Sequence, residues 1–149
     1  MGGTYSGTGV TGVNFSPATA GVGTHTITYT YTDGNSCENT ATTNIVVNAL
    51  PTPGISGPIE SCLGGSGVFT TALIANHSYT WIISGATASS AIDTNILTID
   101  FDTAGTATVQ VLETNDLTGC TATSLVYNIT VYDEPTIGEI ESNTKLTRR

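Results

Sequence analysis

Threonine occupies every second position from Thr24 to Thr32 in the stretch GTHTITYTYTDGNSC, residues 23–37. Because successive side chains of a β-strand point to opposite faces, this period of two predicts a strand with one hydroxyl face and one core-facing side. The expected core-facing residues are His25, Ile27, Tyr29 and Tyr31. The polar run Asp33–Asn35 then predicts a hairpin turn into a second alternating run, ENTATTNIVVN.

Further strand signals recur every 8 to 12 residues along the chain, with turn signals between them. They read GVFTTA, YTWIIS, NILTIDF, GTATVQVLET and TSLVYNITVY, and no segment reads as a helix. The proline-rich run ALPTPGISGP interrupts the pattern and predicts a domain boundary. We therefore expect an all-β protein of two sandwich modules. The predicted ranges are a first module at 1–48, a linker at 49–54, a second module at 55–133 and a tail at 134–149.

The charge of the chain is strongly one-sided. It carries 12 acidic and three basic residues, for a net charge of −9, and the basic residues are Lys145, Arg148 and Arg149. A surface of this sign repels phosphate backbones and anionic lipids, which argues against nucleic-acid or acidic-membrane partners. No apolar stretch approaches the roughly 20 residues that span a bilayer, so membrane insertion is not expected.

An internal repeat links the two predicted modules. AGVGTHTITYTYTDGNSC at 20–37 matches AGTATVQVLETNDLTGC at 104–120, and NIVVN at 44–48 echoes NITVY at 128–132. The first copy has only 19 residues before its Ala-Gly pair, whereas the second has a much longer leading part from Pro51 onward. We expect the first module to be incomplete at its N-terminal side.

The three cysteines follow the same repeat. Cys37 matches Cys120, and Cys62 lies in the leading part that the first module lacks. This predicts a Cys62–Cys120 disulfide and leaves Cys37 unpaired. A disulfide tolerates only about 7 Å between Cα atoms, whereas a sandwich is roughly 20 Å long. Either the first strand brings Cys62 to the last hairpin or the two thiols stay apart. The cysteines show no C-x-x-C spacing, so a zinc site is not expected.

Two stretches resemble known repeat families. GGTYSGTGVTGVNFSPATAGVGTHTITYTYTDGNSCENTATTNIVV is similar to the immunoglobulin-like repeats of large secreted and surface proteins of Bacteroidota, and PTPGISGPIESCLGGSGVFTTA with the strands after it resembles their PKD-like (polycystic-kidney-disease-like) repeat. The resemblance implies tandem β-sandwich modules that act as stalks or adhesin arms, are exported by the type IX route, and meet neighbouring modules of the same polypeptide. It also implies an O-glycan acceptor at Thr103 in Asp-Thr-Ala. An extracellular or cell-surface location follows.

Few residues are candidates for chemistry. Trp81 in YTWIIS is expected in the core, against the alternative of a sugar-stacking platform. The acidic residues Asp100 and Asp102 are expected to be solvated charges, with a Ca²⁺ site shared with Asp116 or Glu113 as the alternative. Neither His25 nor His77 belongs to a hydrolase motif. We expect no catalytic residue and no cofactor other than that Ca²⁺ alternative.

Four functions follow from these observations. The leading one is a non-catalytic structural or adhesive spacer of an extracellular surface protein. A carbohydrate-binding module would need an exposed aromatic row. A self-assembling subunit would use an exposed sheet edge of the incomplete module, into which the tail donates a strand. Ice binding would use the threonine ladder, with Thr26, Thr28 and Thr30 beside Thr40 and Thr42, although sheet twist of about 20° per strand works against a flat array.

Overall fold

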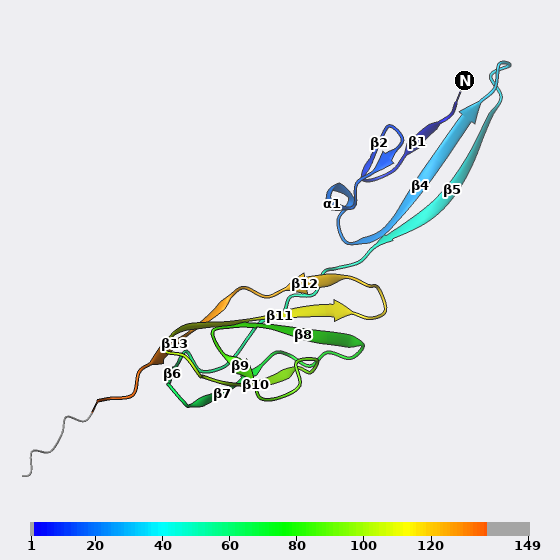
Figure 1. Ribbon diagram of the computed structural model, residues 1–149. Helices are drawn as coiled ribbons and strands as arrows, with labels where there is room; N and C mark the ends of the chain where they lie inside the picture. The colour runs from blue at the N-terminus through cyan, green and yellow to red at the C-terminus, as the bar shows by residue number, and fades with distance from the viewer. Residues whose placement is uncertain (1, 137–149) are drawn as a thin grey trace, which may run out of the picture. The chain divides into compact units, whose positions relative to one another are not determined.

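The computed structural model describes residues 2–136 (Figure 1). These residues form β-strands and one helical turn, which confirms the predicted all-β fold. In chain order the elements are β1 Thr4–Ser6, β2 Val10–Thr11, β3 Asn14–Phe15, α1 Pro17–Ala20, β4 Gly23–Thr32, β5 Glu38–Val47, β6 Glu60–Cys62, β7 Ser66–Thr70, β8 His77–Ser84, β9 Thr87–Ala88, β10 Ile96–Asp100, β11 Gly105–Asn115, β12 Thr121–Thr123 and β13 Tyr127–Tyr132.

The chain divides into two compact units. The first consists of Met1–Pro51 with Thr114–Ala122, and the second of Thr52–Glu113 with Thr123–Arg149. The division between Pro51 and Thr52 falls inside the proline-rich segment that was predicted as a linker, at 49–54. Most of the predicted tail, from residue 137 onward, lies outside the described residues.

Strands β1, β4 and β5 form a three-stranded antiparallel sheet in that order, which we call the open sheet (Figure 1). Strands β4 and β5 pair over ten residues each, from Gly23 opposite Val47 to Thr32 opposite Glu38. Alternating threonines suit a strand of this kind because β-branched side chains pack well on a pleated, half-wet surface.

A short ribbon of β2 and β3 and the helical turn α1 connect β1 to β4. The helix was not predicted, although its start carries a recognisable signal. Ser16 is the N-cap, its Oγ accepts a hydrogen bond from the Thr19 N–H at 3.4 Å, and Pro17 occupies the first turn. Proline is tolerated there because the first N–H groups of a helix have no intrahelical partner.

Two facing sheets form what we call the sandwich. One has the order β7-β10-β9, and the other the order β12-β11-β13-β6, with β8 also paired to β11 (Figure 1). Buried side chains from both sheets make one core, which confirms a β-sandwich. These are Phe69, Tyr79, Trp81, Leu97, Ile99, Phe101, Ala107, Val109, Val111, Ile129 and Val131.

The first segment of the sandwich crosses from one sheet to the other. Ser56 forms an antiparallel bridge to Thr70, the last residue of β7. Strand β6 then pairs in parallel with β13, with Ser61 opposite Val131. At the crossing, Gly57 lies so close to the core that an added Cβ would collide with the Phe69 ring. Only glycine fits this approach.

The last strand is broken by a β-bulge at Ser124–Val126, between β12 and β13. On one side of the bulge Ser124 bonds Val111, and on the other Tyr127 lies opposite Val109. Three residues on the bulged side thus oppose two on β11, which inserts one extra residue. In contrast, β5 pairs with β4 without interruption.

Candidate functional site

The open sheet has two unlike faces. Its hydroxyl face carries Thr4 and Ser6 from β1, alternate threonines from β4, and Thr40, Thr42 and Asn44 from β5. Thr28 lies opposite Thr42 and Thr30 opposite Thr40, in the pairing that the hairpin signal predicted. Strand β1 extends the rows with Ser6 beside Thr28 and Thr4 beside Thr30.

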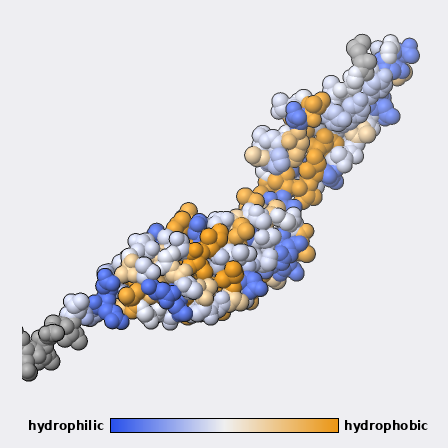
Figure 2. Space-filling view, in the orientation of Figure 1, coloured by the Kyte–Doolittle hydropathy of each residue, from blue (hydrophilic) through white to orange (hydrophobic). Residues whose placement is uncertain are grey.

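The other side, which we call the tyrosine face, carries His25, Ile27, Tyr29 and Tyr31 from β4, with Tyr5 from β1 and Ala41, Thr43 and Ile45 from β5. Apolar surface is visible on this unit in Figure 2. Ile27 is 8% exposed, but Tyr5 is 47% and Tyr31 is 43% exposed. The expected core position of Tyr31 is therefore corrected, because the described residues place no second sheet over this end of β4.

The tyrosine face is hollowed and partly tied down. Hollows of about 140 and 280 Å³ lie beside Tyr29, and Ala41 lines both. The Tyr29 hydroxyl accepts the Gly3 N–H at 3.0 Å, and the Tyr5 and Tyr29 rings are 4.9 Å apart. Near the strand start, His25 Nε2 lies 2.8 Å from the Gly21 carbonyl oxygen, with the Phe15 ring beside it.

In both repeat copies a backbone hydrogen bond from an Asx residue to a cysteine closes the hairpin. The N–H of Asp33 donates to the Cys37 carbonyl, and that of Asn115 donates to the Cys120 carbonyl, both at 2.9 Å. In each hairpin the Asx side-chain oxygen accepts two backbone N–H groups from the turn: those of Asn35 and Cys37 in the first copy, and those of Leu117 and Thr118 in the second.

Asp33 is the acidic residue of the first hairpin, and its pKa is lower than that of an ordinary aspartate. The backbone N–H of Cys37, followed by that of Asn35, bonds the Asp33 carboxylate and holds its pKa below the usual 3.8. Hydrogen bonds to the ionised form favour that form.

These hairpins put the two copies into register. Counting back from Asp33 and Asn115, Tyr31 matches Glu113, Tyr29 matches Val111, and Ile27 matches Val109. On the partner strands Val47, opposite Gly23, matches Val131, opposite Gly105. The side chains of β11 in these positions are fully buried in the sandwich, whereas in β4 only Ile27 is buried and Tyr29 and Tyr31 are partly open. The tyrosine face thus occupies the positions of a sandwich core.

The predicted disulfide is not formed. Cys37, Cys62 and Cys120 are all free thiols. Cys62 pairs with Tyr132 beside the start of β11, whereas Cys120 bonds Asn115 at its end. The length of β11 separates them, roughly 33 Å at about 3.3 Å per residue. The first strand therefore does not bring Cys62 to the last hairpin, and the two thiols stay apart. The reason is that β6 runs parallel to β13 and ends far from that hairpin.

The alternative Ca²⁺ site of Asp100 and Asp102 with Asp116 or Glu113 is not assembled either. Asp102 precedes β11 and Asp116 follows it, so the same strand length keeps them apart. The Asp100 carboxylate accepts the Ser89 hydroxyl at 3.1 Å. Within residues 2–136 no group of three or more His, Cys, Asp or Glu side chains is arranged to hold a metal ion. Thr103, the residue implied as a glycan acceptor, is exposed in the loop between β10 and β11.

Trp81 lies in the core at 3% exposure, and its Nε1 donates to the Thr94 carbonyl at 2.7 Å. A sugar-stacking platform needs an exposed ring, which Trp81 does not offer.

Sequence reasoning missed a buried hydrogen bond between the side chains of β8 and β11. His77 Nδ1 and Glu113 Oε1 are 2.5 Å apart, and the two side chains are 11% and 2% exposed. His77 is the first residue of β8. The alternation of β11 carried the signal, because Glu113 continues the buried series Ala107, Val109 and Val111.

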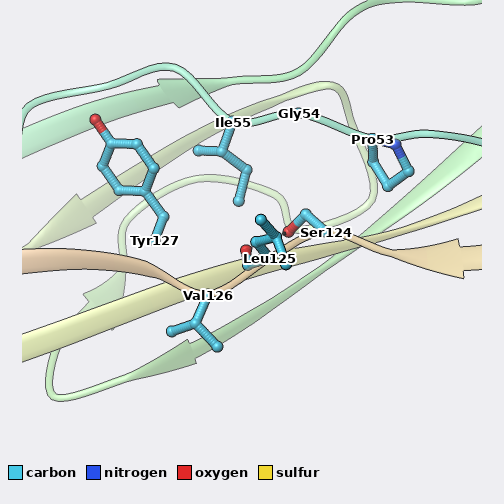
Figure 3. Close-up of a pocket in the computed structure, with 7 residues that line it drawn as sticks. All are labelled: Pro53, Gly54, Ile55, Ser124, Leu125, Val126 and Tyr127. Atoms are coloured by element: carbon cyan, nitrogen blue, oxygen red, sulfur yellow. Dashed lines mark hydrogen bonds between the residues drawn. The ribbon is translucent and has the colours of Figure 1, made fainter.

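A groove of about 340 Å³ lies between Pro53–Ile55 and the bulge (Figure 3). Figure 3 shows Ile55 and Tyr127 beside it, with Val126 pointing away. The Tyr127 hydroxyl donates to the Gly57 carbonyl at 2.6 Å. The groove marks the place where the first segment leaves one sheet for the other.

Within the described part of the chain, no helix has the length and apolar character that crossing a membrane requires. Comparison with models of known protein families gave no match, and comparison with curated proteins gave none either.

Proposed function

We propose that the chain is a non-catalytic structural or adhesive spacer from a large extracellular surface protein. In this proposal it consists of immunoglobulin-like and PKD-like sandwich modules in tandem, the first of them incomplete, with neighbouring modules of the same polypeptide as its partners. The strand orders β7-β10-β9 and β8-β11-β13-β6 support the immunoglobulin-like assignment, since they follow the two-sheet arrangement of that fold.

The observation that carries the spacer role is the parallel pair of β6 and β13. Strand β6 lies near the start of the sandwich and β13 ends it, and they pair at Thr130–Tyr132 with two further bonds, Thr130 N–H to the Ile59 carbonyl and Leu63 N–H to the Tyr132 carbonyl. Tension applied through the chain pulls these parallel strands in opposite directions. All of their hydrogen bonds are then loaded together in shear, which suits a module that holds other domains under force.

Force spectroscopy on the full chain, held by its two ends, tests this role. Leu63→Pro removes the N–H that donates to Tyr132. We expect it to lower the unfolding force of the sandwich by more than its effect on thermal stability would explain.

The matched control is Val109→Ala, which removes buried core volume away from the β6–β13 pair. It should lower thermal stability by about 2 kcal/mol with a smaller loss of unfolding force. Equal losses of force in the two variants, at equal loss of stability, would contradict the spacer mechanism.

Carbohydrate binding remains the second candidate, because the exposed rings of Tyr5 and Tyr31 beside Tyr29 form the aromatic row that such a module needs. A glycan array probed with the wild-type chain and with Tyr31→Ala distinguishes this candidate. Tyr31-dependent binding would support it, and no binding would remove it.

A further inference from the structure

The two repeat copies differ in what lies beyond their last strand. In the sandwich, β13 has β11 on one side and β6 on the other. In the open sheet, β5 has β4 on one side, and no strand of residues 2–136 pairs with its outer edge. Strand β1 pairs with β4 as β8 pairs with β11, so the open sheet lacks the counterpart of β6.

We infer that the outer edge of β5 and the tyrosine face form a docking surface for an extended segment of the β6–β7 type, supplied by the same polypeptide. The segment pairs in parallel with the end of β5 and turns its apolar side chains onto the tyrosine face. Strand addition of this kind takes affinity from main-chain hydrogen bonds and specificity from alternate side chains.

The register follows from the matched strands. Val131 of the sandwich lies opposite Ser61, and Val47 is its counterpart. The docked strand therefore pairs with Val46, Val47 and Asn48. This edge carries no charged residue between Glu38 and Asn48, so it has none of the charges with which natural edge strands usually discourage pairing.

The tyrosine face beneath the docked segment also has a counterpart in the sandwich. In the sandwich, Phe69 of β7 packs its ring against Tyr127 at 5.8 Å in an edge-on contact. The counterpart of Tyr127 is Thr43. It is exposed, and it lines the smaller hollow on the tyrosine face together with Ala41. An aromatic residue from the incoming segment suits this hollow, because its ring would remove apolar surface of Tyr5, Ile27 and Tyr29 from water.

Charge favours this occupant over a charged ligand or a basic partner. The described residues up to Pro51 contain only two acidic side chains, Asp33 and Glu38, and no lysine or arginine. Both acids flank the hairpin turn at the far end of β5 from Val47. A neutral, alternating strand thus meets little repulsion at the predicted docking edge.

The test uses the full chain with an added N-terminal extension. The extension carries the sequence of residues 52–72 with Cys62→Ser. A flexible linker of about 15 residues, which spans about 20 Å on average, joins it to the chain. We expect the thermal transition of the first unit to rise by about 4–8 °C. The amides of Val46, Val47 and Asn48 should also exchange more slowly. The same segment added as a free peptide should shift the same amides, and Ser61→Pro in the extension should abolish both effects.

Two neighbouring residues of β5 give the matched control. Thr43→Lys places a charge on the tyrosine face and should abolish the rise, whereas Thr42→Lys places one on the hydroxyl face and should leave it intact. Both positions are exposed, so both variants should fold.

Equal behaviour of the two lysine variants would overturn the inference. So would an unchanged transition in the extended chain, or self-association of the chain without the extension that protects the same amides, since a second copy would then fill the surface. None of these outcomes bears on the force measurements, because the β6–β13 pair belongs to the sandwich.

Discussion

At the scale of single residues, Asp33 makes the first hairpin sensitive to acid. Its pKa is lowered by the N–H groups of Cys37 and Asn35, so its contribution to stability is complete above the unfolded value near 3.8 and is lost as pH falls through the lower folded value. We expect the Asn35 and Cys37 amides to lose protection at the acid end of this window. Amide exchange followed by NMR from pH 5 to pH 2 measures the loss.

Asp33→Asn is the control, because in the second hairpin an asparagine, Asn115, already accepts the N–H groups of its turn. The variant should keep the turn and remove its pH dependence. An unchanged acid transition in the variant would show that Asp33 is not the titrating group.

The His77–Glu113 pair predicts a large asymmetry between single and double substitutions. Glu113 is almost fully buried and has His77 as its hydrogen-bond partner. His77→Ala should therefore destabilise the sandwich by about 1–3 kcal/mol, because it leaves the buried Glu113 carboxyl group without its hydrogen-bond partner. His77→Leu combined with Glu113→Leu should cost much less. Urea unfolding of the wild type, His77→Leu, Glu113→Leu and the double variant measures the coupling free energy, and additive effects would argue against the pair.

At the scale of elements, the bulge in the last strand depends on one hydroxyl. Ser124 Oγ accepts the Val111 N–H at 3.0 Å and donates to the Leu125 carbonyl at the same distance. Ser124→Ala should cost about 1–3 kcal/mol, since it leaves a buried N–H without its acceptor. Leu125→Ala, at a side chain that is 91% exposed, should stay within about 0.5 kcal/mol. Denaturant midpoints of the two variants decide, and similar losses would assign the cost to the bulge backbone instead.

Elements with strong local periodicity could be predicted from the sequence. The β4–β5 hairpin follows from its alternation and turn residues, and the inward side of β8 follows from the spacing of Tyr79 and Trp81. The parallel pairing of β6 could not be predicted, because three residues carry no usable pattern and their partner lies about 70 positions away. The disulfide error came from the same source, since the position of Cys62 depends on that pairing.

The tyrosine face shows a different kind of failure. Alternation correctly identifies which residues share a face, but it does not say whether another layer covers that face. Tyr29 and Tyr31 have the pattern of core residues, and the described part of the chain leaves Tyr31 exposed.

At the scale of the whole molecule, the two units should differ sharply in stability. Among the described residues up to Pro51, Ile27 is the single buried hydrophobic side chain, whereas the core of the sandwich has eleven. A small unit that buries little apolar surface is marginally stable. We expect calorimetry to show two transitions, with the first unit melting at the lower temperature.

Two substitutions assign the transitions. Ile27→Ala should lower the first and Val109→Ala the second, each by several degrees, because each removes buried apolar volume from one unit only. A single cooperative transition that both variants shift equally would contradict independent units.

The bulge also bears on how such repeats change over evolutionary time. The second hairpin has one residue more than the first between its Asx residue and its cysteine, and the bulge at Ser124–Val126 contains one extra residue on the same strand. The surplus residue is taken up before β13 begins, so Ile129 and Val131 still face the core. A lineage of these modules can therefore gain or lose a residue in the hairpin without rebuilding its interior, which leaves the loop free to diversify.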